Sequence, residues 1–240
     1  MIELSRVSRA YQRGSEKVQA LEGVDLKIAS GSFVALMGPS GSGKSTLLNL
    51  VAGLDTPSSG TVRVGGLVLN DLSEEQLTSW RATHLGFIFQ FYNLLPVLSA
   101  AENVEMPLLL TRLSRAERRS HVGTALDIVG LSHRKDHFPN QMSGGEQQRV
   151  AVARAIVADP ELIVADEPTG DLDAQNANDI LDLLRQLKYE LNKTILMVTH
   201  DPRAERYVDY TIHLDKGLLT DEGTPSGTTP STTNEVGTNT

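Results

Sequence analysis

Residues 38–46 have the types and the spacing of a phosphate-binding loop. They are Gly38, Pro39, Ser40, Gly41, Ser42, Gly43, Lys44, Ser45 and Thr46. Glycines at these positions let backbone N–H groups wrap around phosphate groups, and the N-terminus of a following helix adds a favourable dipole. We expect Lys44 to reach the β- and γ-phosphates of a nucleoside triphosphate and Ser45 to ligate Mg²⁺. A glycine-rich turn before a buried helix would explain neither the lysine nor the adjacent hydroxyl.

Two adjacent carboxylates, Asp166 and Glu167, follow the apolar run 162–165. This run is typical of a buried parallel strand. In a protein with a phosphate-binding loop, an aspartate at such a strand end holds Mg²⁺, commonly through water. Glu167 is then placed to orient and deprotonate the attacking water as a general base. The alternative is a pair of acids in a turn before Pro168.

Polar side chains also follow two other strand-like runs. Gln90 comes after residues 85–89, and His200 comes after residues 194–198. Ligands of open α/β sheets bind at the carboxyl ends of the strands, so Gln90 is a candidate for presenting its amide oxygen to the metal, and His200 for donating to the γ-phosphate. The alternatives are packing against an inserted helical unit for Gln90 and a turn position for His200. The apolar residues 91–96 form either a docking patch or part of that packing.

A second anion-binding pattern opens the helix-like segment 150–158. It consists of Ser143, Gly144, Gly145 and Glu146. A serine and two glycines at a helix start leave N–H groups and a hydroxyl free for phosphate, yet the chain has a single phosphate-binding loop. Either Ser143 is only an N-cap, or this helix end binds the γ-phosphate held by a second copy. The spacing leaves both possibilities open.

The elements that must position these residues follow from hydrophobic periodicity. Residues 1–36 alternate short apolar segments with turns, which predicts antiparallel strands, and Tyr11 among them is a candidate either for stacking on a base or for packing. The pattern predicts helices over 99–128 and 174–191 and a closing strand pair over 208–219. Residues 223–240 are rich in Thr, Ser, Gly and Pro, and we expect them to be disordered.

Composition narrows the class of protein. The 240 residues include no cysteine, which excludes disulfides and thiolate metal sites. The formal charge of −8 argues against a general nucleic-acid binder, which needs a basic surface. The start of the chain lacks the long apolar core of a secretory signal, and no apolar run approaches the ~20 residues of a bilayer-spanning helix. We therefore expect a protein that is soluble or held at a membrane by a partner.

The motifs stand in a characteristic order along the chain. They are the loop 38–46, Gln90, residues 143–147, Asp166 with Glu167, residues 170–173 and His200. This order resembles the ATP-binding subunit of ABC transporters over about residues 1–222. Within that family, residues 38–46, 85–96 and 165–170 are similar to the LolD and MacB type of subunit, and the cell-division FtsE type is also similar.

The resemblance implies roles for single residues. Tyr11 becomes the adenine-stacking aromatic, Gln90 the metal-contacting residue of the Q-loop, and Asp166 the Walker B acid that completes the metal set with Ser45. Glu167 and His200 become the catalytic base and the switch histidine.

The same resemblance makes residues 143–146 the signature that caps the ATP of a second copy, in a head-to-tail homodimer closing over two ATP molecules. This chain departs from the commonest family pattern at Met142, Glu146 and Asp171, where leucine, glutamine and often asparagine are usual. The phosphate-binding serine and glycines remain, so activity is expected, whereas Asp171 affects the details of contact between the copies.

The implied fold is an α/β P-loop NTPase core with an antiparallel β subdomain and an inserted α-helical subdomain at about residues 91–158. Residues 1–222 would form the ATP-binding domain. The implied function is an Mg²⁺-dependent ATPase that powers export, extraction or mechanotransmission through a separate membrane permease of LolCE or MacB type. It would sit peripherally on the cytoplasmic face of the inner membrane, without nucleic acid. The alternatives are a soluble ABC ATPase acting on ribosomes or DNA and an FtsE-like cell-division regulator.

Overall fold

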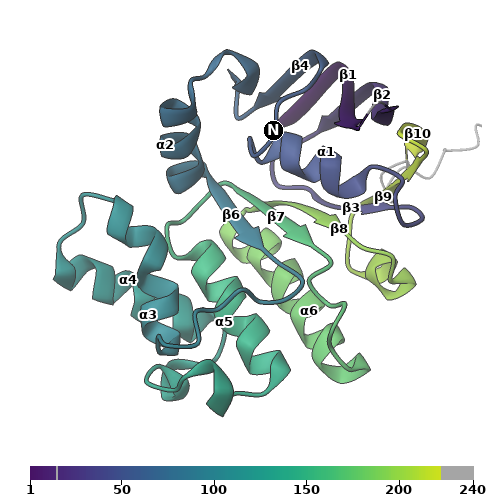
Figure 1. Cartoon of the computed structure of the whole chain (residues 1–240). Helices are drawn as coiled ribbons and strands as arrows, with labels where there is room; N and C mark the ends of the chain where they lie inside the picture. The colour runs from purple at the N-terminus through teal and green to yellow at the C-terminus, as the bar shows by residue number, and fades with distance from the viewer. Residues whose placement is uncertain (15, 223–240) are drawn as a thin grey trace, which may run out of the picture.

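A computed structural model describes residues 1–14 and 16–222, so the expectation for residues 223–240 lies outside the described part (Figure 1). The strands are β1 (Ile2–Arg13), β2 (Glu16–Ile28), β3 (Phe33–Met37), β4 (Ser59–Val64), β5 (Leu67–Val68), β6 (Leu85–Ile88), β7 (Leu162–Asp166), β8 (Thr194–Val198), β9 (Tyr210–Asp215) and β10 (Leu218–Glu222). The α-helices are α1 (Lys44–Val51), α2 (Glu74–His84), α3 (Ala100–Glu105), α4 (Arg115–Ile128), α5 (Gly144–Ile156) and α6 (Ala174–Leu191).

The central sheet has the strand order β10-β9-β3-β8-β7-β6 and is parallel except for the β9–β10 hairpin at its edge. Its inner strands are buried on both faces, which explains their continuous apolar runs. Along β3, Phe33 and Ala35 point into one core and Val34 and Leu36 into the other, because successive side chains of a strand alternate between faces. The sheet therefore separates two hydrophobic cores.

One core lies between the central sheet, α1 and a second, antiparallel sheet of order β2-β1-β4-β5. This second sheet is the expected β subdomain at the start of the chain, and Figure 1 shows it beyond α1 on one side of the central sheet. The long β1–β2 ribbon brings Tyr11 opposite Val18. Tyr11 is thereby carried on a paired strand rather than a loop.

The other core lies beneath the opposite face of the central sheet, where α5 and α6 pack, with α3 and α4 beside α5 (Figure 1). Helices α3, α4 and α5 all come between the neighbouring strands β6 and β7 in the chain. The continuous helical pattern expected over 99–128 is interrupted: α3 ends at Glu105, a 3-10 turn, η2 (Met106–Leu110), follows, and α4 begins at Arg115. Pro107 and a new capping box at Ser114 explain the break, since proline cannot donate to the helix interior and the serine starts a new one.

Among the described residues, no helix has both the length and the apolar content needed to cross a membrane.

Candidate active site

The carboxyl ends of β3, β7 and β8 open onto one cleft of about 680 Å³. The loop after β3 forms its floor, and it is also lined by Tyr11 from β1, by Glu167 after β7 and by His200 after β8. These residues are far apart in the sequence, and the order of the parallel strands brings them to the same edge of the sheet. The cleft therefore collects most of the candidate residues for nucleotide chemistry.

The loop between β3 and α1 has the backbone of an anion cradle. Gly43, which precedes α1, has φ 104°, and a side chain there would collide with the carbonyl oxygen of Ala20. Gly41 has φ 78° with open space around its Cα. Both positions require glycine, since other residues rarely adopt such φ values. This loop leads directly into α1, and the first N–H groups of a helix have no partners within the helix. They are therefore available to a phosphate group.

Lys44 fits an anionic ligand. Its side chain is 7% exposed, and its ammonium group donates hydrogen bonds to the carbonyl oxygens of Gly38 and Pro39, both at 2.8 Å. These partners are neutral, and within the described part of the chain Lys44 makes no salt bridge with a carboxylate. A buried cation held only by carbonyl oxygens in a cleft of backbone donors suits a phosphate chain.

Asp166 and Ser45 together offer the oxygen atoms of a candidate metal site. They are hydrogen-bonded, and burial together with the charge of Glu167 raises the pKa of Asp166, against the lowering effects of Ser45 and Lys44. In the described residues, no cluster of three or more His, Asp or Glu side chains is placed to hold a metal. One carboxylate and one hydroxyl fit Mg²⁺, which keeps several waters and takes its other ligands from phosphate groups.

Glu167 and His200 are in direct contact. The distance from His200 Nδ1 to Glu167 Oε2 is 2.7 Å. Glu167 has a left-handed backbone, φ 47°, which its N–H bond to the carbonyl oxygen of Val198 helps to hold. Non-glycine residues rarely adopt this conformation, and it is found often at functional sites. The strand end thus presents a carboxylate and an imidazole as one pair at the cleft.

The ring of Tyr11 is fixed from one side. Its hydroxyl donates to Asp55 Oδ2 at 2.7 Å, and the guanidinium of Arg9, itself paired with Asp55, lies 4.6 Å from the ring centroid. The ring lines the cleft and is 37% exposed. A flat aromatic surface held this way is suited to stacking on a nucleotide base.

Gln90 lies outside this cleft. It follows β6, and its side chain rests against Gly170 in the loop after Glu167, where an added Cβ would lie 3.1 Å from Gln90 Nε2. The structure therefore brings Gln90 beside the loop 170–173 and not among the residues that line the nucleotide cleft.

Residues 143–146 also lie away from the cleft of their own chain. Ser143 is the N-cap of α5: its hydroxyl accepts from the N–H of Glu146, and the Glu146 carboxylate accepts from the N–H of Ser143 at 2.8 Å. Glu146 also pairs with Arg134 at 3.1 Å. Gly144 and Gly145 let Tyr92 and Asn176 pack closely against the start of α5, since a Cβ at either position would crowd these side chains. The pattern is thus an N-cap, and its residues are not among those that line the cleft of their own chain.

Comparison with known proteins decides the family. Residues 21–170 match the ABC transporter family. The chain is 45% identical over 221 residues to the uncharacterized ABC transporter ATP-binding protein MJ0796 of Methanocaldococcus jannaschii, covering 90% of this chain and 94% of the relative. The chain belongs to the ABC transporter family. The resemblance inferred from the motifs is confirmed.

Other relatives agree with this assignment. The lipoprotein-releasing system ATP-binding protein LolD of Bordetella pertussis is 43% identical over 91% of this chain and 94% of its own length. The macrolide export ATP-binding/permease protein MacB of Hyphomonas neptunium is 46% identical over 93% of this chain but only 35% of its own length. A dimeric structure of MJ0796 in a post-hydrolysis state, bound to ADP and Pi, superimposes with a TM-score of 0.85 at 42% identity and covers 93% of this chain and 98% of that chain. These relatives confirm the expected ABC ATPase fold and the expected class of enzyme.

The structure adds supporting residues of this ABC cassette that the sequence analysis missed. Gln148 is fully buried in α5 and donates from Nε2 to the carbonyl oxygen of Pro168 at 2.6 Å, which ties α5 to the turn that carries Glu167. Arg9 and Asp55 fix Tyr11. The position of Gln148 on the apolar face of a helix could have predicted a buried, hydrogen-bonded side chain. No pattern in the sequence indicates that Arg9 pairs with Asp55.

We predict that Asp166→Asn stabilises the nucleotide-free cassette. Because burial and Glu167 raise the pKa of Asp166, its ionised form costs folding free energy at neutral pH, and this cost fades as the pH falls through the raised pKa. We expect Tm to rise at pH 7.5 by about 2–4 °C per kcal/mol gained. The gain should shrink at lower pH. Asp171→Asn makes the same change at an exposed carboxylate, and an equal gain there would contradict the assigned cause.

We predict that Tyr11→Ala weakens ATP binding about tenfold, because a base–aromatic stack contributes roughly 1–3 kcal/mol. Affinity should be measured by titration calorimetry with ATP and, in parallel, with tripolyphosphate, which has no base. Tyr11→Phe keeps the ring and removes only the bond to Asp55, so it should bind ATP nearly as the parent does. Equal losses for ATP and tripolyphosphate would show that Tyr11 does not contact the base.

Proposed function

We propose that this chain is the ATP-hydrolysing subunit of a membrane transporter and that ATP-driven closure of two copies moves a separate permease. The observation that carries the proposal is the Glu167–His200 pair at the mouth of a cleft whose floor is the phosphate loop with Lys44. A cassette that only bound nucleotide would not need a carboxylate and an imidazole held together at that place.

The phosphate loop and its neighbours would bind ATP. The backbone N–H groups of the non-proline residues in 38–46 would surround the phosphates, Lys44 would neutralise them, and Tyr11 would stack on adenine. Ser45 and Asp166 would hold Mg²⁺, with Gln90 joining them when its loop moves away from Gly170. The bound ion supplies charge neutralisation at the phosphoryl group. The attacking water would then be oriented by the side chains that lie beyond the γ-phosphate, Glu167 and His200.

Glu167 acts as the general base, because it is the carboxylate that lines the cleft. Its neighbour Asp166 is hydrogen-bonded to Ser45 and would instead hold the metal. Its left-handed backbone and its bond to Val198 fix the direction of the carboxylate. His200, paired with Glu167 through Nδ1, keeps Nε2 for the γ-phosphate. Catalysis is then mainly positioning and electrostatic stabilisation.

A second copy completes the site. Residues 143–146 lie apart from the cleft of their own chain, so Ser143, Gly144 and Gly145 are available to the γ-phosphate held by a partner copy. MJ0796 forms dimers in solved structures. Glu146 is the N3 residue of the capping box, where glutamine would make the same bond, which explains why this departure from the family pattern is tolerated.

The membrane partner would dock on the helical insertion, about residues 91–158 within an ATP-binding domain of residues 1–222. Large apolar side chains are exposed there: Phe91 is 70%, Val97 78% and Leu110 76% exposed. Such exposure marks interaction surfaces. By analogy with LolD and with the ATP-binding part of MacB, the cassette would bind a permease of that type at the cytoplasmic face of the membrane and power export, extraction or mechanotransmission.

The test is purification of the tagged chain from gently solubilised membranes, followed by identification of the co-purified proteins and measurement of phosphate release. We expect an integral membrane permease and ATP hydrolysis that requires Mg²⁺. Ribosomes or DNA without a membrane protein would contradict the transporter role while leaving the ATPase chemistry in place. A cell-division complex would favour the FtsE-like alternative.

A further inference from the structure

One residue at the start of α5 carries a charge of the same sign as phosphate. Glu146 lies in the first turn of this helix, three residues after Ser143, where the helix start is the proposed contact for the γ-phosphate held by a second copy. The hydrogen bond from the N–H of Ser143 lowers the pKa of Glu146, and the charge of Arg134 lowers it further, against the raising effect of burial. The carboxylate is therefore ionised at neutral pH, and by itself it would repel a phosphate group.

The loop beside this helix start adds two more carboxylates. Asp171 and Asp173 flank Leu172, and a Cβ added at Gly144 would lie 3.7 Å from the side chain of Leu172. Asp173 is the N-cap of α6, and the hydrogen bond from the N–H of Asn176 lowers the pKa of its carboxyl group. A phosphate group that arrives at α5 from a second copy would thus meet an acidic surface unless a cation offsets it.

Arg134 pairs directly with Glu146. Nε of Arg134 donates to Oε1 of Glu146 at 3.1 Å, while the other carboxylate oxygen, Oε2, accepts from the N–H of Ser143 at 2.8 Å. The side chains of the pair are 37% and 25% exposed. Because the pair is partly withdrawn from solvent, its charges are screened less than those of a fully exposed salt bridge. The guanidinium therefore offsets the charge of the carboxylate at the helix start.

The position of Arg134 is fixed by its own surroundings. Its Nη1 lies 3.0 Å from Nε2 of His137, which must be the acceptor because a guanidinium only donates. The carbonyl oxygens of Lys135 and His137 accept from the N–H groups of Ala101 and Ala100 at 2.9 and 2.8 Å, which ties this turn to the start of α3. The guanidinium is thus held in place by contacts on the side away from the carboxylate.

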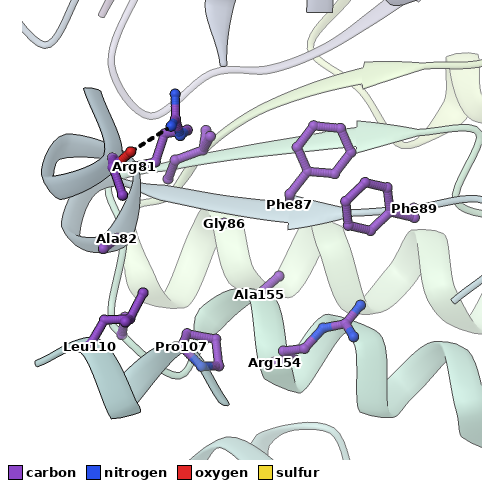
Figure 2. Close-up of a pocket in the computed structure, with 12 residues that line it drawn as sticks. Arg81, Ala82, Gly86, Phe87, Phe89, Pro107, Leu110, Arg154 and Ala155 are labelled. Atoms are coloured by element: carbon purple, nitrogen blue, oxygen red, sulfur yellow. Dashed lines mark hydrogen bonds between the residues drawn. The ribbon is translucent and has the colours of Figure 1, made fainter. Parts of the chain in front are cut away.

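The arginines of α5 itself are engaged elsewhere. Arg149 pairs with Asp179 of α6 at 3.3 Å. Arg154, in the last turn of α5, points toward Phe89 in Figure 2 and donates to backbone carbonyl oxygens of the loop after β6. Arg134, from the segment that precedes the helix, is consequently the cation that neutralises the carboxylate at the helix start.

We propose that Arg134 is a positioning residue of the two-copy ATP site, because by neutralising Glu146 it lets the start of α5 accept the γ-phosphate held by a second copy. The inference rests on the proposed function and adds a residue outside the motifs to the closure of two copies. A glutamine at position 146 would make the same capping bond without a charge, so the need for Arg134 comes from the glutamate of this chain. Arg134 does not line the cleft, so nucleotide binding within one copy should not depend on it.

The test is a double-mutant cycle of Arg134→Gln and Glu146→Gln in the full chain carrying Glu167→Gln, which should keep ATP unhydrolysed. Analytical ultracentrifugation at rising Mg²⁺-ATP concentration measures dimer formation. Arg134→Gln removes the charge but keeps a side chain that donates hydrogen bonds. We expect it to raise the dissociation constant of the dimer roughly tenfold alone, and less than about twofold when Glu146→Gln is also present.

Further measurements separate the charge from a merely structural role. Arg134→Lys keeps the cation and should dimerise nearly as the parent does. The loss caused by Arg134→Gln should shrink as the salt concentration rises, since ions screen the repulsion. ADP has no γ-phosphate and should bind equally to all variants, which also verifies that each one is folded. The matched control is Arg118→Gln, which removes a salt bridge of similar exposure, to Glu105 at 2.8 Å, and should leave dimer formation unchanged.

The outcomes separate this inference from the proposed function. If Arg134→Gln has no effect, or an equal effect with and without Glu146→Gln, the role of Arg134 is overturned and the proposed ATPase stands. Equal losses from Arg134→Lys and Arg134→Gln, or a loss that salt does not change, overturn it as well. If the chain with Glu167→Gln alone forms no dimer with Mg²⁺-ATP, the proposed closure of two copies fails, and this inference fails with it.

Discussion

Glu167→Gln will lower the rate of ATP hydrolysis by about 10²–10⁴-fold, the range expected for loss of a general base, and will leave ATP binding nearly unchanged. Glutamine has the shape of glutamate but cannot accept the proton of the attacking water. The side chain lies at the cleft beside His200, and the proposed contacts of Lys44 and the phosphate loop with the nucleotide do not involve it. ATP should therefore accumulate unhydrolysed in the site.

The measurement is phosphate release under single-turnover conditions, together with size-exclusion chromatography in Mg²⁺-ATP. We expect Glu167→Gln to run as a dimer with ATP and as the nucleotide-free species without it. Glu161→Gln is the matched control, since it makes the same change at an exposed carboxylate outside the cleft. Hydrolysis by Glu167→Gln at the parent rate would refute the base assignment.

Lys44→Ala will weaken ATP binding by about 10–100-fold, because charge-assisted contacts to phosphate contribute roughly 1.5–3 kcal/mol. Among the described residues, the hydrogen bonds of the Lys44 ammonium group go to the carbonyl oxygens of Gly38 and Pro39, so its removal breaks no salt bridge. The loss should therefore appear in nucleotide affinity more than in Tm. Titration with ATP and a thermal melt on the same sample separate the two effects.

Lys193→Ala is the control for Lys44→Ala. Lys193 is also a buried lysine, 6% exposed, but it pairs with Asp159 at 2.6 Å, away from the residues that line the cleft. Its removal should lower Tm and leave ATP affinity unchanged. If both variants lost ATP affinity equally, the effect of Lys44 would be general destabilisation rather than lost contact with phosphate.

Short-range features could be predicted from the sequence because the interactions that form them span few residues. The capping boxes at Ser114 and Ser143 each join residues only three apart in the chain. The spacing of the phosphate loop fixes its own backbone, through glycines that alone tolerate the required φ values. Helix α6 has the bounds expected from its periodicity, since a strongly amphipathic run with an aspartate N-cap leaves little choice.

Contacts between distant segments were decided by the tertiary structure. Glu167 contacts His200 because β7 and β8 are neighbours in the sheet. The sequence of a single strand does not reveal which strand will pair with it. The position of Gln90 against Gly170 and the fixation of Tyr11 by Arg9 and Asp55 likewise depend on how separate elements pack. The sequence by itself determined which residues could bind and hydrolyse a nucleotide, since those chemistries require particular side chains at particular spacings. Only the tertiary structure decided which of them meet at one cleft and which lie outside it, because sheet order and helix packing set distances that local spacing does not.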